Sequence, residues 1–277
     1  MAFFVGLIGA IGWAVSYFMG NNSIAVIVLI VAAVYALIQY FAAGNLAVAM
    51  TGAREIQKAD DPRLYRTVEN LAITTGMPMP KVYIIDDPAP NAFATGRDPQ
   101  HAVVGTTTGL LEIMDDRELT AVMAHELGHV QNYDIRVSTI AFGLVSAIGL
   151  LSDLVLRMLF FSGDNRNNNT HPLVLVLGIV VIILAPVIAA IVQMAVSRQR
   201  EYLADATGAL TTRDSEGLAS ALAKLGQYGR PMKRESTSTA NLFLSNPLRP
   251  GFFTKLFSSH PPLEDRIKRL RDNSGTF

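Results

Sequence analysis

The sequence predicts a mainly α-helical integral membrane protein, with about four transmembrane helices and an α+β part that carries a small β-sheet. Two observations lead to this prediction. Half of the 277 residues are hydrophobic, and the mean hydropathy is +0.32. Moreover, residues 1–53 and residues 167–197 contain no Lys, Arg, Asp or Glu. Such a composition excludes an ordinary soluble domain and, more firmly, an intrinsically disordered chain.

The remaining composition narrows the classes of function. The 23 basic and 23 acidic side chains give a net charge of zero, whereas a nucleic-acid binder normally shows an excess of basic residues. The chain has no cysteine, so it can form no disulfide and offers neither a thiol nucleophile nor a Cys ligand for zinc. We therefore expect no nucleic-acid partner.

The first element, residues 1–43, is expected to form a transmembrane hairpin with spans at about 3–19 and 24–43. The 20 residues of the second span would measure about 30 Å as a helix, which matches the hydrocarbon core of a bilayer. A cleaved signal peptide is the alternative for the first span. It would carry Lys or Arg near its start, and no basic residue precedes Arg54, so the hairpin is favoured.

Two further spans are expected at about 138–159 and 173–195. The fourth span is interrupted only by Pro186 and Gln193, and proline is tolerated in membrane helices. The third contains Asp153 and Arg157, which are spaced to form an ion pair near the interface. A peripheral or partly inserted helix is the alternative for this segment, because charges within spans are rare.

Basic residues near the span ends lie on one side of this topology. Arg54, Lys58, Arg63 and Arg66 follow span two, Arg136 precedes span three, and Arg198 and Arg200 follow span four. The opposite side holds the uncharged turn 20–23 and a loop with Arg166 alone. The positive-inside rule therefore places residues 44–137 and 198–277 in the cytoplasm, beside the lipid bilayer.

Residues 44–137 have the pattern of a small α/β unit. Asp60 or Asp61 can cap a helix whose first residue is Pro62 and which ends at Gly76. The apolar stripe of this helix consists of Leu64, Val68, Leu71 and Ala72. Short strands are expected at 81–85, 91–95 and 102–106.

A capping box then predicts the start of another helix. Asp115 and Glu118 have the required spacing, with Asp in place of Ser or Thr. We expect this helix to run through Val130, and the sequence leaves open whether it continues into the third span.

Residues 198–277 are expected to be largely helical. Residues 201–210 would prolong the fourth span, and apolar stripes mark further helices around 218–225 and 263–270. Between these, residues 229–250 are rich in Ser, Thr, Pro and Gly, and we expect a mobile loop there.

The chemistry is carried by His125-Glu126-Leu127-Gly128-His129, an H-E-x-x-H motif on a predicted helix. Two His at i and i+4 lie on one helical face, where both imidazoles can bind one zinc ion. Glu126 is placed beside them, as a general base for a water molecule requires. Two surface His near a Glu are the ordinary structural alternative.

A catalytic zinc site needs a third protein ligand. In the metzincin arrangement it would be a His six residues after His129, but that residue is Ile135. Glu201 is the best candidate, and Asp205 is its i+4 neighbour on the same helical face. Asp205 could accept the second N–H of a ligating His. An ordinary solvated helix face is the alternative for this pair.

Several motifs together resemble the HtpX-type membrane zinc endopeptidases, over nearly the whole chain. They are the N-terminal hairpin, Asn91-Ala92-Phe93-Ala94-Thr95-Gly96, the H-E-x-x-H, Ser197-Arg198-x-Arg-Glu201-Tyr202-x-Ala-Asp205, and Ser259-His260-Pro261-Pro262-Leu263.

The resemblance implies a zincin-like protease domain with one catalytic Zn²⁺, bound by His125, His129 and Glu201, and Glu126 as the catalytic base. It also implies a protease of the bacterial plasma membrane that faces the cytoplasm. Its expected substrates are misfolded or damaged membrane proteins and unfolded polypeptides, and self-cleavage is a further implied activity.

Two weaker candidates depend on family motifs. Asn91 would contact substrate at a strand edge, where an extended polypeptide could add as an extra strand; a plain turn residue is the alternative. His260 would donate to the oxyanion; a surface His before a Pro-Pro turn is the alternative. Other functions remain open: a CAAX-type prenyl-protein endopeptidase, or a non-catalytic zinc-binding membrane scaffold.

Overall fold

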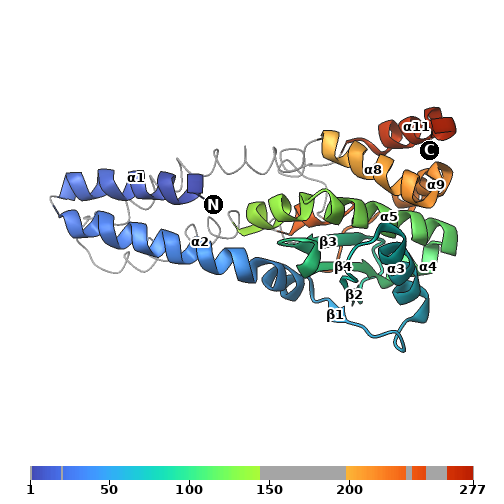
Figure 1. Cartoon of the computed structure of the whole chain (residues 1–277), viewed down its shortest axis with the longest axis horizontal. Helices are drawn as coiled ribbons and strands as arrows, with labels where there is room; N and C mark the ends of the chain where they lie inside the picture. Colours follow the sequence, from blue (N-terminus) through green and yellow to red (C-terminus); the bar gives the residue numbers. More distant parts are fainter. Residues whose placement is uncertain (1, 20, 144–197, 235–238, 248–260, 277) are drawn as a thin grey trace, which may run out of the picture. The chain divides into compact units, whose positions relative to one another are not determined.

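The structure is a computed structural model, and it describes residues 2–19, 21–143, 198–234, 239–247 and 261–276 (Figure 1). The chain divides into two compact units, one of residues 1–43 with 143–191 and one of residues 44–142 with 192–277. The fourth predicted span, and the third beyond residue 143, lie outside the described residues.

The first unit contains α1 (Ala2–Met19) and the beginning of α2 (Asn22–Thr51). Gly12 faces α2 so closely that a Cβ atom there would lie 2.6 Å from a methyl carbon of Val28, so glycine permits the close approach of the two helices. Helix α2 continues to Thr51, beyond the predicted end at residue 43.

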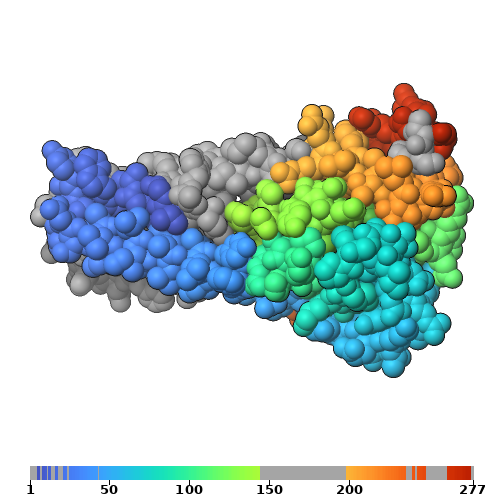
Figure 2. Space-filling view, in the orientation of Figure 1, coloured from blue at the N-terminus to red at the C-terminus, as the bar shows by residue number. Residues whose placement is uncertain are grey.

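Among the described residues, one helix is long and apolar enough to cross a bilayer. It is α2, whose segment Ala25–Ala42 has a mean hydropathy of 2.4. Large apolar side chains of this helix, including Val31, Val34 and Phe41, are more than half exposed, and α2 forms part of the molecular surface in Figure 2. These features suit contact with lipid. They bear on one of the four predicted spans.

The second unit is built on a four-stranded mixed sheet in the order β1-β2-β4-β3. The strands are β1 (Arg54–Glu55), β2 (Lys81–Ile85), β3 (Ala92–Gly96) and β4 (Ala102–Thr107). β2 and β4 are parallel, in a register that pairs Lys81 with Val103. β3 and β4 form an antiparallel hairpin through the 3-10 turn η1 (Pro99–His101). The sequence predicted three of these strands and missed β1.

Helix α3 (Pro62–Thr75) confirms the predicted end signals. Asp61 is the N-cap and accepts a hydrogen bond from the backbone N–H of Leu64, and Gly76 ends the helix in the left-handed conformation with φ 67°. The predicted stripe of Leu64, Val68, Leu71 and Ala72 is buried. A short helix, α4 (Thr108–Ile113), follows β4 and was not predicted.

Helix α5 (Asp116–Gln131) begins at the predicted capping box of Asp115 and Glu118. It does not continue into the third predicted span. Asn132 ends it, Tyr133 adopts a positive φ of 59°, and a separate helical segment covers residues 134–143. This break thus ends α5 directly after the H-E-x-x-H motif.

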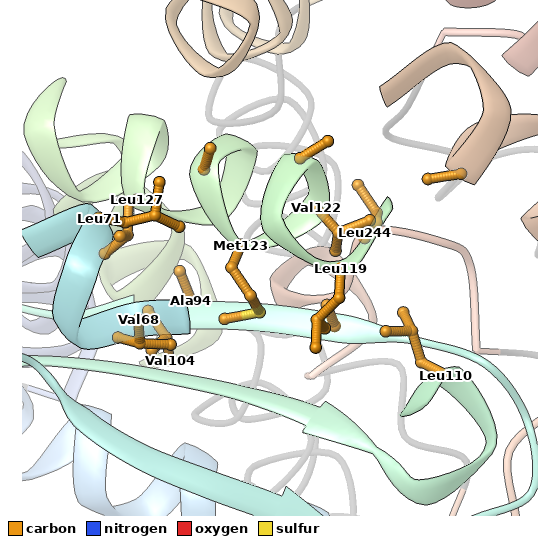
Figure 3. Close-up of a cluster of buried hydrophobic side chains, with 14 of the residues drawn as sticks. Val68, Leu71, Ala94, Val104, Leu110, Leu119, Val122, Met123, Leu127 and Leu244 are labelled. Carbon is orange, nitrogen blue, oxygen red and sulfur yellow. The ribbon is translucent and has the colours of Figure 1, made fainter. Parts of the chain in front are cut away.

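Helices α8 (Arg198–Thr212), α9 (Ser215–Tyr228) and α11 (Leu263–Asp272) pack on one another, and α8 and α9 also pack on α5. Figure 1 shows α5 between the sheet and these three helices. The main core, part of which is drawn in Figure 3, joins the sheet, α3, α5 and α9, so α5 is buried on most sides. A short 3-10 turn, η4 (Ser274–Thr276), follows α11.

The expected loop 229–250 is exposed at residues 229–231 but is packed against the protein at Met232 and in its later described part, residues 239–247. Met232, Phe243 and Leu244 are each at most 3% exposed, and residues 240–242 form a 3-10 turn, η3 (Ala240–Leu242). Its Ser, Thr, Pro and Gly content disfavours helices and long strands, but it does not prevent single apolar side chains from anchoring the chain.

Candidate metal centre

Helix α5 places both histidines of the motif on one face. The His125 and His129 rings meet edge to face with centroids 4.7 Å apart, and their Nε2 atoms lie 3.2 Å from each other. His125 is fully buried and His129 is half-buried. The i,i+4 spacing alone produces this juxtaposition, because side chains four residues apart stack on a helix.

Helix α8 can bring Glu201 to these rings because small residues line its crossing with α5. A Cβ atom on Gly128 would lie 3.3 Å from the backbone oxygen of Ala204, and one on Gly208 would lie 3.0 Å from the backbone nitrogen of His125. Larger side chains at either glycine would push the helices apart.

Glu201 completes a cluster of three potential ligands. Its Oε1 atom lies 3.5 Å from His129 Nε2, and its Oε2 atom lies 3.9 Å from His125 Nε2. One ligand atom from each of the three residues lies within 4.8 Å of the others.

Each histidine is also oriented from behind by a carboxylate. Asp205 Oδ1 lies 3.0 Å from His125 Nδ1, and Asp134 Oδ2 lies 3.0 Å from His129 Nδ1. An N–H on each Nδ1 would donate to these carboxylates and leave the Nε2 lone pairs facing the centre of the cluster. The predicted role of Asp205 beside a histidine therefore agrees with this geometry.

Arg266 holds the two carboxylates of α8. Its guanidinium is fully buried and binds Asp205 through two hydrogen bonds, Nε to Oδ2 at 2.9 Å and Nη2 to Oδ1 at 2.6 Å. Its Nη1 atom lies 3.3 Å from Glu201 Oε2. Such a bidentate pair fixes both the position and the plane of the carboxylate.

These residues fit a zinc ion by distance. Atoms bound tetrahedrally to one zinc at about 2.0–2.2 Å lie roughly 3.3–3.6 Å from one another. The separations of 3.2, 3.5 and 3.9 Å within the His125, His129 and Glu201 cluster are close to that range.

The local charge also fits a divalent cation. Four carboxylates, of Glu126, Asp134, Glu201 and Asp205, are gathered in this cluster. Two guanidinium groups, of Arg200 and Arg266, contact them, and Arg200 Nη1 donates to Asp134 Oδ1 at 2.9 Å. Within the described part of the chain, carboxylates thus outnumber guanidinium groups at this cluster, and a cation can balance the excess negative charge.

Burial and the carboxylates shift the pKa values of the cluster in opposite directions. Burial lowers the pKa of His125 to about 4, despite the contact with Asp205. Burial also lowers the pKa of His129, but the hydrogen bond with Asp134 and the charge of Glu201 outweigh it and raise the pKa to about 9. The cluster therefore favours a positive charge between its carboxylates, whether a proton or a metal ion supplies it.

Glu126 lies in the same buried setting. Desolvation raises the pKa of its carboxyl group to about 7, and Glu201 adds to this effect, whereas His129 and Arg266 oppose it. Asp205 behaves differently, because Arg266 outweighs the effect of burial and lowers its pKa to about 2.

Comparison with known proteins identifies the family that uses this arrangement. The model of the peptidase family M48 matches residues 58–274, which include every residue of the cluster. The chain belongs to peptidase family M48. It is therefore a metalloprotease, and M48 peptidases are zinc metalloproteases.

Relatives of this M48 peptidase match nearly its whole length. It is 60% identical to a protein named protease HtpX homolog from Tropheryma whipplei (strain Twist), over 99% of this chain and 94% of that protein. It is 44% identical to a protein of the same name from Lactobacillus helveticus (strain DPC 4571), over 98% and 94%. The predicted HtpX-type membrane protease is confirmed.

A solved structure supports the fold. The crystal structure of S. mikatae Ste24p superposes with a TM-score of 0.55 at 21% identity, and the match covers 96% of this chain. The chain spans 62% of that longer protein, and at this identity the likeness concerns the fold alone.

The two weaker candidates of the M48 peptidase have different outcomes. His260 lies outside the described residues. Asn91 is 2% exposed, directly precedes β3, and uses its side-chain amide to bind the backbone of Ser245. In this structure the amide of Asn91 thus faces the chain's own polypeptide, and its predicted contact with substrate stays a prediction.

Asp134, Arg200 and Arg266 were not placed in the cluster from the sequence. Asp134 follows the helix break at Tyr133, which no glycine marks. Arg266 lies within the apolar stripe of Leu263, Ile267 and Leu270, and a charge on a buried face was the available signal.

Proposed function

We propose that this M48 peptidase is a multi-pass zinc endopeptidase of the bacterial plasma membrane. It hydrolyses misfolded or damaged membrane proteins and unfolded polypeptides at the cytoplasmic face, and it can cleave itself. The observation that carries the proposal is the convergence of His125 Nε2, His129 Nε2 and the Glu201 carboxylate, with an aspartate behind each histidine.

In this proposal His125, His129 and Glu201 hold the zinc ion. Zinc in such a site supplies Lewis-acid polarisation of the scissile carbonyl and increases the acidity of water. Asp205 and Asp134 keep the protons of the imidazoles on Nδ1, and Arg266 fixes the Asp205 and Glu201 carboxylates.

Glu126 acts as the base of the proposed reaction. It takes a proton from the attacking water and delivers that proton to the amine of the leaving peptide. Asn91 binds the extended substrate backbone at the start of β3, and His260 donates to the oxyanion.

The membrane topology follows from the distribution of basic residues. Residues 44–137 and 198–277 would lie together in the cytoplasm, connected by the span pair within 138–197 and anchored by the hairpin 1–43. The apolar, exposed segment Ala25–Ala42 supports the anchor.

The test compares the full-length wild type with Glu126→Gln in detergent micelles. Both proteins should contain one zinc ion, and the variant should cleave casein and a model membrane protein at least about 100-fold more slowly, because a general base is lost.

Glu118→Gln is the matched control, since Glu118 is a buried glutamate on the same helix outside the cluster and its loss should leave activity per folded molecule intact. Full activity of Glu126→Gln would contradict the mechanism, and absence of zinc from the wild type would contradict the metal assignment.

A further inference from the structure

The outer edge of β3 is covered by the chain itself. Residues 239–247, which we name the strap, run along this edge, and Phe243 forms an antiparallel bridge with Phe93. The backbone N–H of Leu244 donates to the backbone oxygen of Ala92 at 2.8 Å. The strap thus makes the contacts that an extended polypeptide makes when it adds to a sheet edge.

The side chain of Asn91 binds the backbone of the strap. The Asn91 side chain donates from Nδ2 to the backbone oxygen of Ser245 at 2.8 Å and accepts at Oδ1 from the Ser245 backbone N–H at 3.0 Å. An amide that pairs with both groups of one residue reads the main chain and not the side chain. This mode of binding suits extended polypeptides of many sequences, as a protease for diverse substrates requires.

The strap reaches the helix of the H-E-x-x-H motif. Its side chains alternate as in a strand: Phe243 packs on Phe93 with ring centroids 5.8 Å apart, and Leu244 joins the main core. Figure 3 shows Leu244 in the same cluster as Val122, which lies about one turn before His125 on α5. A polypeptide bound at this position of β3 would therefore run close to the catalytic helix.

The other end of the same edge is closed by a side chain. The Thr139 hydroxyl donates to the backbone oxygen of Gly96 at 2.9 Å and lies 3.3 Å from the Gly96 backbone nitrogen. The strap therefore covers the Asn91 end of the β3 edge, where the substrate contact is predicted, and Thr139 covers the Gly96 end.

The strap pairs with β3 over a shorter stretch of backbone than a strand of the sheet does. β3 and β4 are paired over five residues, whereas strap and β3 share one bridge. One end of the strap is held by the Met232 N–H, which donates to the Pro247 oxygen at 3.1 Å, and the adjacent Lys233 N–H donates to Asp87 at 2.6 Å. A short backbone pairing of this kind can be exchanged for a longer one, provided that apolar side chains of the substrate take the places of the buried Phe243 and Leu244 side chains.

We propose that the strap is an internal occupant of the substrate site, which extended polypeptides displace when they add to β3. The proposal rests on the proposed protease function and adds a regulation of the same site. While the strap is paired, Asn91 and the β3 edge are unavailable to substrate; when a polypeptide segment replaces it, the same backbone contacts are made to the substrate.

The absence of cysteine makes a reversible lock possible. Phe93 and Phe243 face each other across the bridge, so the variant Phe93→Cys with Phe243→Cys should form a cross-strand disulfide on treatment with oxidised glutathione. We expect the oxidised full-length protein to lose most of its casein cleavage and to regain it after a phosphine reductant. The matched control is Glu55→Cys with Tyr83→Cys, which links β1 to β2, two strands from β3. Because Tyr83 packs against the apolar cluster of Phe93 and Phe243, this control is compared only with itself, and it should cleave casein equally when oxidised and when reduced.

The outcomes separate the strap from the protease function. Equal activity of the oxidised and reduced Phe93, Phe243 variant would overturn the displacement of the strap and leave the protease function standing. Absence of cleavage by the wild type would instead contradict the proposed function.

A second measurement decides the case in which the reduced variant is itself inactive. Hydrogen exchange of the Leu244 and Ser245 amides is followed in full-length Glu126→Gln, with and without β-casein. Faster exchange with casein is expected from displacement, and unchanged or slower exchange would show that the strap is a permanent strand.

Discussion

Helix α5 carries two buried clusters of charge, about two turns apart, and they differ in how their polar groups are used. At its start, Glu118 accepts hydrogen bonds from Ser220 at 2.7 Å, from Lys224 at 2.6 Å and from the backbone of Asp115 at 3.0 Å. At the motif, the acceptor atoms of two histidines and Glu201 face one another.

The difference separates structural charge from functional charge. The cap cluster, formed by Asp115, Glu118, Ser220 and Lys224, contains its own donors and joins α5 to α9. The metal cluster holds more negative charge than its guanidinium groups balance, so it needs an added cation. Burial alone does not distinguish Glu118 from Glu126, because Glu118 is 3% exposed and Glu126 is 2% exposed.

Removing Arg266 should have the largest effect on the metal cluster. Arg266→Met leaves Asp205 and Glu201 buried without their guanidinium partner, and we expect a loss of about 3–5 kcal/mol in the free energy of unfolding, together with weaker zinc binding. Denaturation and zinc titration against a competing chelator measure the two effects.

The control for this variant is Arg271→Met on the same helix. Arg271 pairs with Glu216, and both side chains are about half exposed, so its loss should leave zinc binding unchanged. If Arg266→Met bound zinc as tightly as the wild type, Arg266 would have no role in orienting the ligands.

The cap cluster offers the next largest effect, and it should concern stability alone. Glu118→Gln removes a charged acceptor, which we expect to lower the free energy of unfolding by about 1.5–3 kcal/mol at pH 7 without changing zinc content. Lys224→Met should have a similar consequence, since it removes the donor of the same ion pair.

The pH dependence of this effect has a defined sign. Burial acts to raise the pKa of Glu118, but hydrogen bonds from Lys224 and Ser220 outweigh this effect and hold the pKa below its usual value. The stabilisation is therefore complete above the unfolded-state pKa of about 4.3 and is lost as the pH falls through the lower native value. The stability difference between wild type and Glu118→Gln should thus shrink under acid; a difference that grew would contradict the ion pair.

The sequence predicted those features whose signals lie within a few residues. The capping box of Asp115 and Glu118, the cap at Asp61 and the i,i+4 histidines each depend on one helical turn, and local geometry determines them. The position of Glu201 could be proposed because a zinc site requires a third ligand.

Features that depend on tertiary packing were not accessible in this way. Arg266 binds Asp205 across 61 positions of sequence, and the strap meets Asn91 across about 150. Asp134 reaches His129 because Tyr133 takes a positive φ, which tyrosine rarely adopts and no propensity would indicate. A charge inside an apolar stripe, as at Arg266, is the signal that merits attention in similar sequences.

Asp134 provides a smaller test within the metal cluster. Asp134→Asn keeps the shape of the side chain but removes the charge that orients the His129 imidazole, so zinc affinity should fall about 10–100-fold while the fold is retained. Zinc titration measures this change, and circular dichroism checks the fold. Unchanged affinity would mean that the His129 imidazole does not depend on the Asp134 charge for its orientation.

An exposed ion pair between α5 and α9 should give the smallest effect and completes the comparison. Arg117 and Asp214 form a bidentate pair across these helices, close to the cap cluster, but the Arg117 side chain is 58% exposed. Water and salt screen such a pair, so Arg117→Ala should lower the free energy of unfolding much less than Glu118→Gln does. Measurement of Glu118→Gln and Arg117→Ala in low and high salt tests the reason for the difference: added salt should reduce the small effect of Arg117→Ala further and leave that of Glu118→Gln nearly unchanged. Equal effects at both sites would mean that burial does not set the strength of the ion pairs between α5 and α9.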